Sequence, residues 1–135
     1  YCGVGVLGVA AARATGAGLV VGHEVSAEAV ETARRVASTA GVAARFETVN
    51  LQDRAVVPAE ALGVIIVNPP RRGLSAAVLS AVLSADAPVV MMSCDATSFA
   101  RDAQALVAAG RTMGRVEVYD MLPQTTHVEL LATFR

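Results

Sequence analysis

Cys94 has the side chain best suited to covalent chemistry in this chain, and its position is favourable for it. It follows the apolar run Pro88 to Met92 and comes just before the start of an expected helix. A helix N-terminus favours a thiolate, whereas the like charge of the neighbouring Asp95 opposes ionisation. Taken alone, a cysteine after an apolar strand is more often a small core residue. Cys94 is therefore a candidate reactive thiol that needs support from other residues.

A carboxylate, Glu129, begins the last apolar segment of the chain, within His127-Val128-Glu129. Side chains alternate along a strand, so His127 and Glu129 share one face and Val128 takes the other. A glutamate at this point can simply be a solvated carboxylate on an edge strand. Without further evidence, we favour that interpretation.

The beginning of the chain carries a glycine pattern of a different kind. Residues 3 to 8, GVGVLG, fit G-x-G-x-x-G, and Glu24 follows 21 positions after Gly3. That spacing is close to the one expected of a nucleotide-binding βαβ unit, in which the acidic residue accepts hydrogen bonds from ribose hydroxyls. NAD and S-adenosylmethionine both contain a ribose whose hydroxyls need such an acceptor. The alternative is a tight strand-to-helix turn that binds no ligand.

The segment Asn68-Pro69-Pro70-Arg71-Arg72-Gly73 follows another apolar run, Leu62 to Val67. Two prolines make the loop rigid, and the Asn68 amide offers both a donor and an acceptor. An aromatic residue after the prolines would indicate methylation of an amino group on a stacked base, and Arg71 in that place argues against it. The two arginines suit an RNA phosphate or a flipped nucleotide. The alternative is a rigid loop with an arginine pair in solvent.

These residues lie in a chain that alternates between strand and helix patterns. The expected helices are 6–15, a helix capped by Ser26 and closed by Gly41, 74–84 and 97–109, and the expected strands are 18–22, 44–49, 62–67, 88–92, 115–119 and 128–134. The loop 120–127 is too short for a crossover helix, so the last two strands should be antiparallel. We predict an α/β fold with a doubly wound, mostly parallel sheet, whose first strand is truncated. Ligands of such sheets bind at the carboxyl ends of the strands, where Glu24, Asn50, Asn68, Cys94 and Glu129 fall.

Composition limits the classes of function. The 135 residues suffice for one domain, and the 54% hydrophobic content excludes a disordered chain. With 11 basic and 12 acidic residues, the chain lacks the strongly basic balance of a domain that grips nucleic acid by itself. No apolar run reaches the roughly 18 residues of a membrane span. Its two cysteines suit a reducing cytoplasm and are too few for a four-cysteine cluster, so we expect no metal.

Taken together, these motifs resemble the bacterial uracil-5 RNA methyltransferases that use S-adenosylmethionine, and NPPRRG resembles most the subgroup that acts on 23S ribosomal RNA. The resemblance runs in order through nearly the whole chain: YCGVG, the glutamate of GHEVS, NPPRRG, SCDATSFARD and DMLPQTTHVELL. It departs from the family at Asp95, where asparagine is usual, and at Asn50, where an acidic residue is common.

The resemblance implies a role for each matching residue. Cys94 would be the nucleophile that adds to C6 of uracil, and Glu129 the base that removes the C5 proton. The expected S-adenosylmethionine contacts are Tyr1, Gly3, Gly5, Glu24, Asn50 and Asn68. The expected RNA contacts are Arg71, Arg72 and His127.

The resemblance also leads us to expect a catalytic domain over residues 1–135 that is a piece of a longer, cytoplasmic and monomeric protein. An RNA-binding region, with an iron–sulfur cluster in the ribosomal members, would precede Tyr1, and this piece alone would have little activity. Three other readings stay open: a transfer-RNA uracil-5 methyltransferase, a NAD-dependent dehydrogenase and an inactive truncated binding module.

A binding experiment distinguishes a protein that uses S-adenosylmethionine from one that uses NAD. We expect the intact protein to bind S-adenosylhomocysteine in isothermal titration calorimetry and to give no heat with NADH. The reason is that Cys94 and Glu129 at strand ends would serve no purpose in hydride transfer. Tight binding of NADH alone would favour the dehydrogenase instead.

Overall fold

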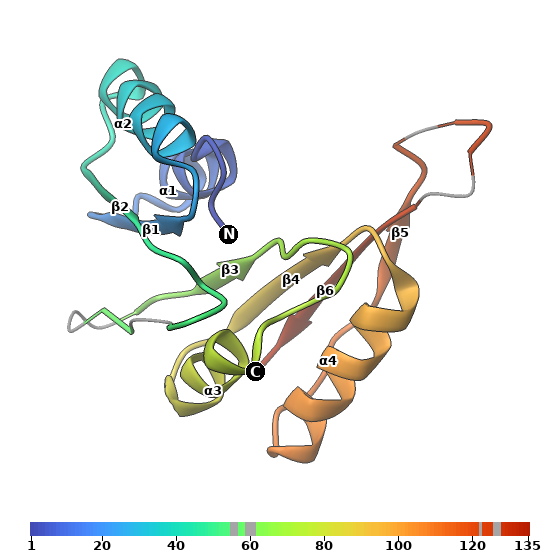
Figure 1. Cartoon of the computed structure of the whole chain (residues 1–135). Helices are drawn as coiled ribbons and strands as arrows, with labels where there is room; N and C mark the ends of the chain where they lie inside the picture. The colour runs from blue at the N-terminus through green and yellow to red at the C-terminus, as the bar shows by residue number, and fades with distance from the viewer. Residues whose placement is uncertain (55–56, 59–61, 122, 126–127) are drawn as a thin grey trace. The chain divides into compact units, whose positions relative to one another are not determined.

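The computed structural model describes residues 1–54, 57–58, 62–121, 123–125 and 128–135. The chain divides into two compact units, Tyr1–Pro58 and Ala59–Arg135 (Figure 1). Hydrogen bonds join the described strands into two sheets, one in each unit. The units are described separately below.

The first unit is a parallel strand pair packed against two helices. It contains α1 (Val6–Thr15), β1 (Val20–Glu24), α2 (Ala27–Ala40) and β2 (Ala44–Thr48). The register runs in parallel from Val20 beside Ala44 to Glu24 beside Thr48. A small core holds the unit together, formed by Val9, Val30, Ala33, Ala37 and Phe46. Three of these residues, Val30, Ala33 and Ala37, lie at helical spacing on α2.

Both ends of α2 are set by the residues that the sequence indicated. The Ser26 hydroxyl accepts a hydrogen bond from the Ala29 N–H at 3.2 Å. At the other end Gly41 adopts the left-handed conformation, with φ 66°, and its N–H is bonded to carbonyls of the last turn. These caps explain why the helix begins and ends where it does.

The second unit contains a four-stranded sheet in the order β3-β4-β6-β5 (Figure 1). Its elements are β3 (Ile65–Val67), α3 (Ala76–Ser84), β4 (Val89–Ser93), α4 (Ala96–Ala108), β5 (Glu117–Tyr119) and β6 (Glu129–Phe134). β3 and β4 are parallel, whereas β6 runs antiparallel to both β4 and β5. The predicted antiparallel ending is therefore confirmed, and β6 lies between its two partners.

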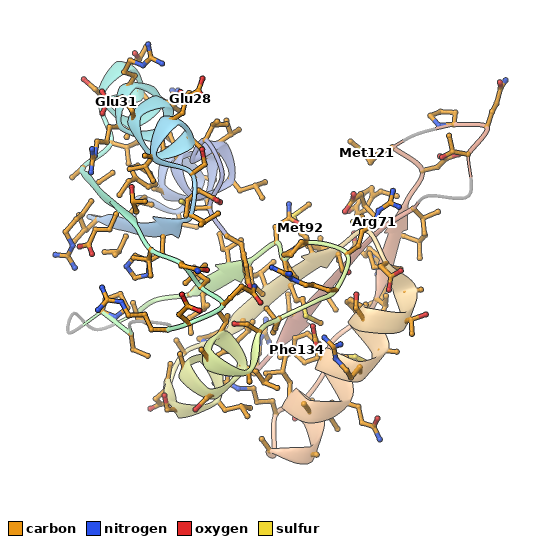
Figure 2. The ribbon with its side chains drawn as sticks, viewed as in Figure 1. Glu28, Glu31, Arg71, Met92, Met121 and Phe134 are labelled. Atoms are coloured by element: carbon orange, nitrogen blue, oxygen red, sulfur yellow. The ribbon has the colours of Figure 1, made fainter. Side chains whose placement is uncertain are left out.

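One face of this sheet forms the core of the second unit. Along β4 the side chains of Val89, Met91 and Ser93 are buried, and the intervening ones are only partly so. Helix α4 packs against β4 and β6. Phe134, labelled in Figure 2, and Leu106 of α4 are fully buried.

The predicted fold class is confirmed, with shifts at the strand ends. β1 begins and ends two residues later than expected, so that Glu24 is its last residue instead of following it. β3 is limited to three residues, because Leu62, Gly63 and Val64 do not pair. The expected continuous sheet is hydrogen-bonded as two separate sheets. Among the described residues, only Tyr1 and Cys2 pair along the second edge of β1, both donating to the His23 carbonyl.

None of the helices in the described part of the chain is long and apolar enough to cross a membrane.

An arginine after α4 completes the packing of α3. The Arg111 guanidinium donates to the carbonyls of Ala87 at 2.7 Å, Val82 at 3.0 Å and Ala85 at 2.6 Å. The last carbonyls of a helix have no partner within the helix, and a cation there also complements the helix dipole. Arg111 therefore fixes the end of α3 and its connection to β4.

We expect Arg111→Met to lower the free energy of unfolding by about 1–3 kcal/mol, because three partly buried carbonyls lose a charged donor while the aliphatic stem is kept. Urea denaturation would measure the change. Arg35→Met is the matched control, since Arg35 is exposed and donates to Thr32 of its own helix. Equal effects of the two substitutions would contradict this role for Arg111.

Candidate active site

Glu24 ties the end of β1 to the glycine-rich loop. Its Oε2 accepts a hydrogen bond from the Gly3 N–H at 3.0 Å. Its Oε1 accepts from the N–H groups of Val25 at 2.8 Å and Ser26 at 3.3 Å. The structure thus brings together two residues that the sequence placed 21 positions apart.

These contacts keep the Glu24 carboxylate ionised. Partial burial alone would raise its pKa. The backbone N–H groups of Gly3, Ser26 and Val25 outweigh that effect, so the pKa of Glu24 lies below its usual value. A carboxylate has about four acceptor positions, of which the backbone uses three, so Glu24 can still accept a hydrogen bond from a ligand.

The start of α1 has two properties of a ligand-binding turn. Gly5, the N-cap, has φ 79°, and no side chain caps the helix there. The first-turn N–H groups of α1 are therefore available to an anionic group. Gly5 also has a packing role, because a Cβ there would lie 2.9 Å from the Ala33 Cβ and 3.0 Å from the Phe46 ring. Only glycine adopts that φ without strain and leaves room for these two side chains.

Tyr1 and Asn50 lie on either side of Gln52 in the first unit. The Gln52 amide donates to the Tyr1 hydroxyl at 3.3 Å, and its backbone N–H donates to the Asn50 amide oxygen at 3.1 Å. The Asn50 amide nitrogen donates to Asp53 at 2.7 Å. Because the Val49 N–H donates to the Glu24 carbonyl at 2.8 Å, this loop begins beside the end of β1. The predicted cofactor residues of the first unit thus gather at the carboxyl ends of β1 and β2.

Cys94 occupies a braced turn between β4 and α4. The buried Ser93 hydroxyl donates to the Asp95 carbonyl at 3.1 Å and accepts from the Asp95 N–H at 3.3 Å. The Ser98 hydroxyl donates to the same carbonyl at 3.2 Å. Cys94 itself is a free, partly buried cysteine. Its backbone is therefore held on both sides while its thiol stays partly accessible.

The register of β4 with β6 places Cys94 and Glu129 next to its last pair. The antiparallel ladder ends at Ser93 and Leu130, and Cys94 and Glu129 are the residues directly beyond that pair, with Cys94 at a bend. Burial alternates along both strands, and Glu129 belongs to the less buried face. A thiol and a carboxylate 35 residues apart in sequence thus lie at adjoining strand ends.

Asp95 caps α4 with its carboxylate. Its Oδ1 accepts from the Ser98 N–H at 2.8 Å. The pKa of Asp95 is lowered, first by hydrogen bonds from the backbone and side chain of Ser98, with a further contribution from the charge of Arg71. The sequence had indicated only that Asp95 opposes ionisation of the thiol. Its main structural role is to begin the helix that follows Cys94.

The loop after β3 presents its polar residues to solvent. Asn68, Arg71 and Arg72 are exposed, whereas Pro69 is buried. The Gly73 N–H donates to the Pro70 carbonyl at 2.8 Å, which closes a turn over the arginine pair. Figure 2 labels Arg71 together with Met92 of β4. His127, the third predicted RNA contact, lies outside the described residues.

Each unit therefore gathers its own predicted residues. Sequence reasoning missed four polar side chains beside them: Ser93, Ser98, Arg101 and Asp102. The pattern Asp95-x-x-Ser98 is a capping signal that could have revealed the helix start. Nothing in the sequence marks Asp102 as buried. Within the described ranges, no group of three or more His, Cys, Asp or Glu residues is placed to hold a metal ion.

Parallel strands followed by antiparallel β6, with polar groups at their carboxyl ends, define a Rossmann-like methyltransferase fold. Precorrin-6Y C5,15-methyltransferase from Geobacter metallireducens has this fold, with a TM-score of 0.72 over 99% of this chain and 76% of its own, at 8% identity. The tRNA (uracil-54, C5)-methyltransferase of Pyrococcus abyssi, solved with S-adenosyl-L-homocysteine, is nearer. Its TM-score is 0.85 at 31% identity, over 100% of this chain and 33% of its own.

The chain belongs to the methyltransferase small domain family, whose match covers residues 1–87. It is 39% identical to an uncharacterized RNA methyltransferase of Gloeobacter violaceus, over 98% of this chain and 29% of the relative. It is 36% identical to the 23S rRNA (uracil(747)-C(5))-methyltransferase RlmC of Pectobacterium atrosepticum, over 100% of this chain and 36% of the relative. The predicted resemblance to uracil-5 RNA methyltransferases is confirmed. The chain spans about a third of the length of these relatives.

The low pKa of Glu24 leads to a testable pH dependence. A carboxylate whose pKa is lower in the folded protein stabilises it fully above the unfolded pKa, about 4.3, and this contribution is lost as the pH falls through the folded value. We therefore expect the stability difference between wild type and Glu24→Gln to be full above that unfolded pKa and to shrink as the pH falls below it. Thermal unfolding at several pH values would measure it.

Glu28→Gln, at an exposed position on the first turn of α2, removes one charge from the same unit and serves as the control. A Glu24→Gln difference that stays constant over that pH range would contradict the assignment.

Proposed function

We propose that the intact protein transfers a methyl group from S-adenosylmethionine to C5 of a uridine in RNA. The observation that carries the proposal is the β4–β6 register, whose last pair, Ser93 and Leu130, adjoins Cys94 on one strand and Glu129 on the other. We favour 23S ribosomal RNA as the substrate, because the relative from Pectobacterium atrosepticum is named for that activity and aligns with the whole of this chain.

The first unit has the groups that S-adenosylmethionine requires. Glu24 retains acceptor capacity for the ribose hydroxyls, and the uncapped N-terminus of α1 suits the carboxylate of the methionine part. A Cβ at Gly3 would meet no atom within 4 Å, so there is room for a ligand to approach that backbone closely. Tyr1 and Asn50 complete the proposed contacts of this unit, and Asn68 of the second unit is a further proposed contact. The likeness to the S-adenosyl-L-homocysteine complex from Pyrococcus abyssi supports this choice of cofactor.

The chemistry needs a nucleophile and a base, because C5 of uracil is by itself a poor nucleophile. The Cys94 thiolate forms a bond to C6, and the ring electrons move to C5 and O4 as an enolate. When bound, S-adenosylmethionine supplies the electrophilic methyl group that C5 takes. Glu129 then accepts the C5 proton, and the electrons of that C–H bond re-form the C5–C6 double bond as the thiolate leaves.

The substrate must be unstacked from its RNA strand to reach the Cys94 thiol. Arg71 and Arg72 are exposed at the neighbouring loop and would bind the phosphates beside the extruded uridine. His127 stays part of this proposed RNA contact. With a formal net charge of −1, the chain offers a local positive site instead of a broadly basic surface.

A transfer-RNA substrate is the second candidate. The specific observation in its favour is the TM-score of 0.85 with the Pyrococcus abyssi enzyme, whose name states tRNA uracil-54 as the target. Methylation assays of the intact protein with transcripts of 23S ribosomal RNA and of transfer RNA would separate the two. Methylation of transfer RNA alone would overturn the ribosomal assignment.

We expect Cys94→Ala to lower the methylation rate by about 10³-fold or more, because no other group can form the bond to C6. Glu129→Gln should instead accumulate a covalent protein–RNA adduct, since addition proceeds and proton removal fails. Denaturing gels and mass spectrometry of the Cys94 peptide would detect it. Cys2→Ala is the matched control, because Cys2 is the other free cysteine and lies in the first unit. Full activity of Cys94→Ala would exclude the proposed mechanism.

A further inference from the structure

A buried charge in α4 contacts the loop that carries the arginine pair. The Asp102 side chain is 2% exposed, and its Oδ2 accepts from the Leu74 N–H at 2.7 Å. Its Oδ1 accepts from Arg101 Nε at 2.9 Å and Nη2 at 2.7 Å. A buried carboxylate is very costly unless it is paired and hydrogen-bonded. Asp102 can be tolerated here because the loop and Arg101 together satisfy it.

Arg101 extends the contact to the other side of the same turn. Its Nη2 also donates to the Arg72 carbonyl at 2.9 Å. The Arg101–Asp102 pair therefore binds the backbone on both sides of Gly73: the carbonyl of Arg72 before it and the N–H of Leu74 after it. Two hydrogen bonds, one accepted by the Asp102 carboxylate and one donated by the Arg101 guanidinium, thus hold one short stretch of loop against the helix.

Gly73 shows how closely the loop approaches. It has φ +82°, and a Cβ there would overlap the Arg101 guanidinium and the Asp102 carboxylate. It would also lie 3.0 Å from the Ser98 Cβ. The loop backbone is therefore in direct contact with α4 at a position that only glycine can occupy without displacing these groups.

The contact leads along one face of α4 to the Cys94 turn. Asp95, Ser98 and Asp102 are spaced by three and then four residues, so they lie on one side of the helix. Ser98 touches the position of Gly73 and also donates its N–H to Asp95, the residue after Cys94. The arginine loop and the Cys94 turn are thus attached to the same two turns of helix.

We propose that Arg101 and Asp102 are positioning residues that set Arg71 and Arg72 in place relative to Cys94 when RNA is bound. The inference rests on the proposed function, because the arginines are assigned to RNA there. The pair acts through the loop backbone and touches neither the reacting atoms nor the cofactor residues of the first unit. Its loss should therefore slow attack on the uridine much more than it weakens cofactor binding, in which Asn68 is the one proposed contact on this loop.

The test uses Asp102→Asn in the intact protein. An asparagine can keep one acceptor for the Leu74 N–H, but its amide nitrogen then faces the Arg101 guanidinium, donor against donor. We expect the single-turnover rate of methylation and the rate of adduct formation at Cys94 to fall by about 10- to 100-fold, as misplacement by about 1 Å can cause. Calorimetry should show the affinity for S-adenosylhomocysteine unchanged within about twofold. An unchanged rate of adduct formation would overturn the proposal.

Two further variants test the proposal at an exposed residue, where a substitution is less disruptive to folding than at the buried Asp102. The Arg101 side chain is 58% exposed, so Arg101→Met and Arg101→Lys should fold. We expect a loss with methionine and a partial recovery with lysine, which keeps the charge but reaches only one of the two acceptors. Equal rates for both variants and wild type would overturn the proposal even if Asp102→Asn failed to fold.

Arg111→Met is the matched control for stability, because it weakens the same unit at α3 and contacts no part of the loop. At equal folded fraction it should keep the wild-type rate of adduct formation. If it slows that rate as much as Asp102→Asn, the effect is one of stability and the positioning role is wrong. If wild-type protein methylates RNA and the Arg101 and Asp102 variants do so equally well, only the positioning role fails. Absence of methylation by wild type would overturn the proposed function and this inference with it.

Discussion

The antiparallel register between β4 and β6 is the constraint on which the candidate site depends. Side chains alternate between the two faces of a strand, so a slip of one residue would move every buried residue of β6 to the other face. The buried residues of the two strands, Val89, Met91 and Ser93 with Leu130, Ala132 and Phe134, exclude that slip. The same packing fixes Ser93 across from Leu130, the neighbours of Cys94 and Glu129. Apolar burial far from the chemistry thus determines which polar groups meet.

Polar contacts within the turn between β4 and α4 are a second constraint on Cys94. The Ser93 hydroxyl, the Asp95 carboxylate and Ser98 form hydrogen bonds around Cys94, and the Asp102 carboxylate connects the next turn of α4 to the arginine loop. Each of these groups is satisfied within the second unit. In the first unit, Glu24 plays a comparable role by joining the end of β1 to the glycine loop. In each unit the predicted residues are therefore held in place by local polar contacts before any ligand binds.

The sequence predicted best what local chemistry determines. The bounds of α1 and the two caps of α2 follow from glycine and serine positions, and the structure has them as predicted. Strand ends were less predictable, because β1 and β3 extend only as far as a partner strand pairs with them. The insertion of β6 between β4 and β5 depends on contacts distant in sequence. The burial of Asp102 could not be predicted either, since an aspartate in a helix is usually exposed and the Leu74 N–H that helps to satisfy it comes from a loop 28 residues earlier.

The two positive-φ glycines at the start of the chain differ in their surroundings. This difference affects how their motif can be used to recognise related proteins that still bind a ligand. Gly3 faces open space, whereas Gly5 is confined between Ala33 and Phe46. Packing alone would preserve the second glycine in a descendant of this protein that had lost its ligand. A search for degenerate copies should therefore give little weight to Gly5 and more to Gly3 together with Glu24. A relative that lacks Gly3 and Glu24 but retains Gly5 would be one that keeps the fold and has lost ligand binding.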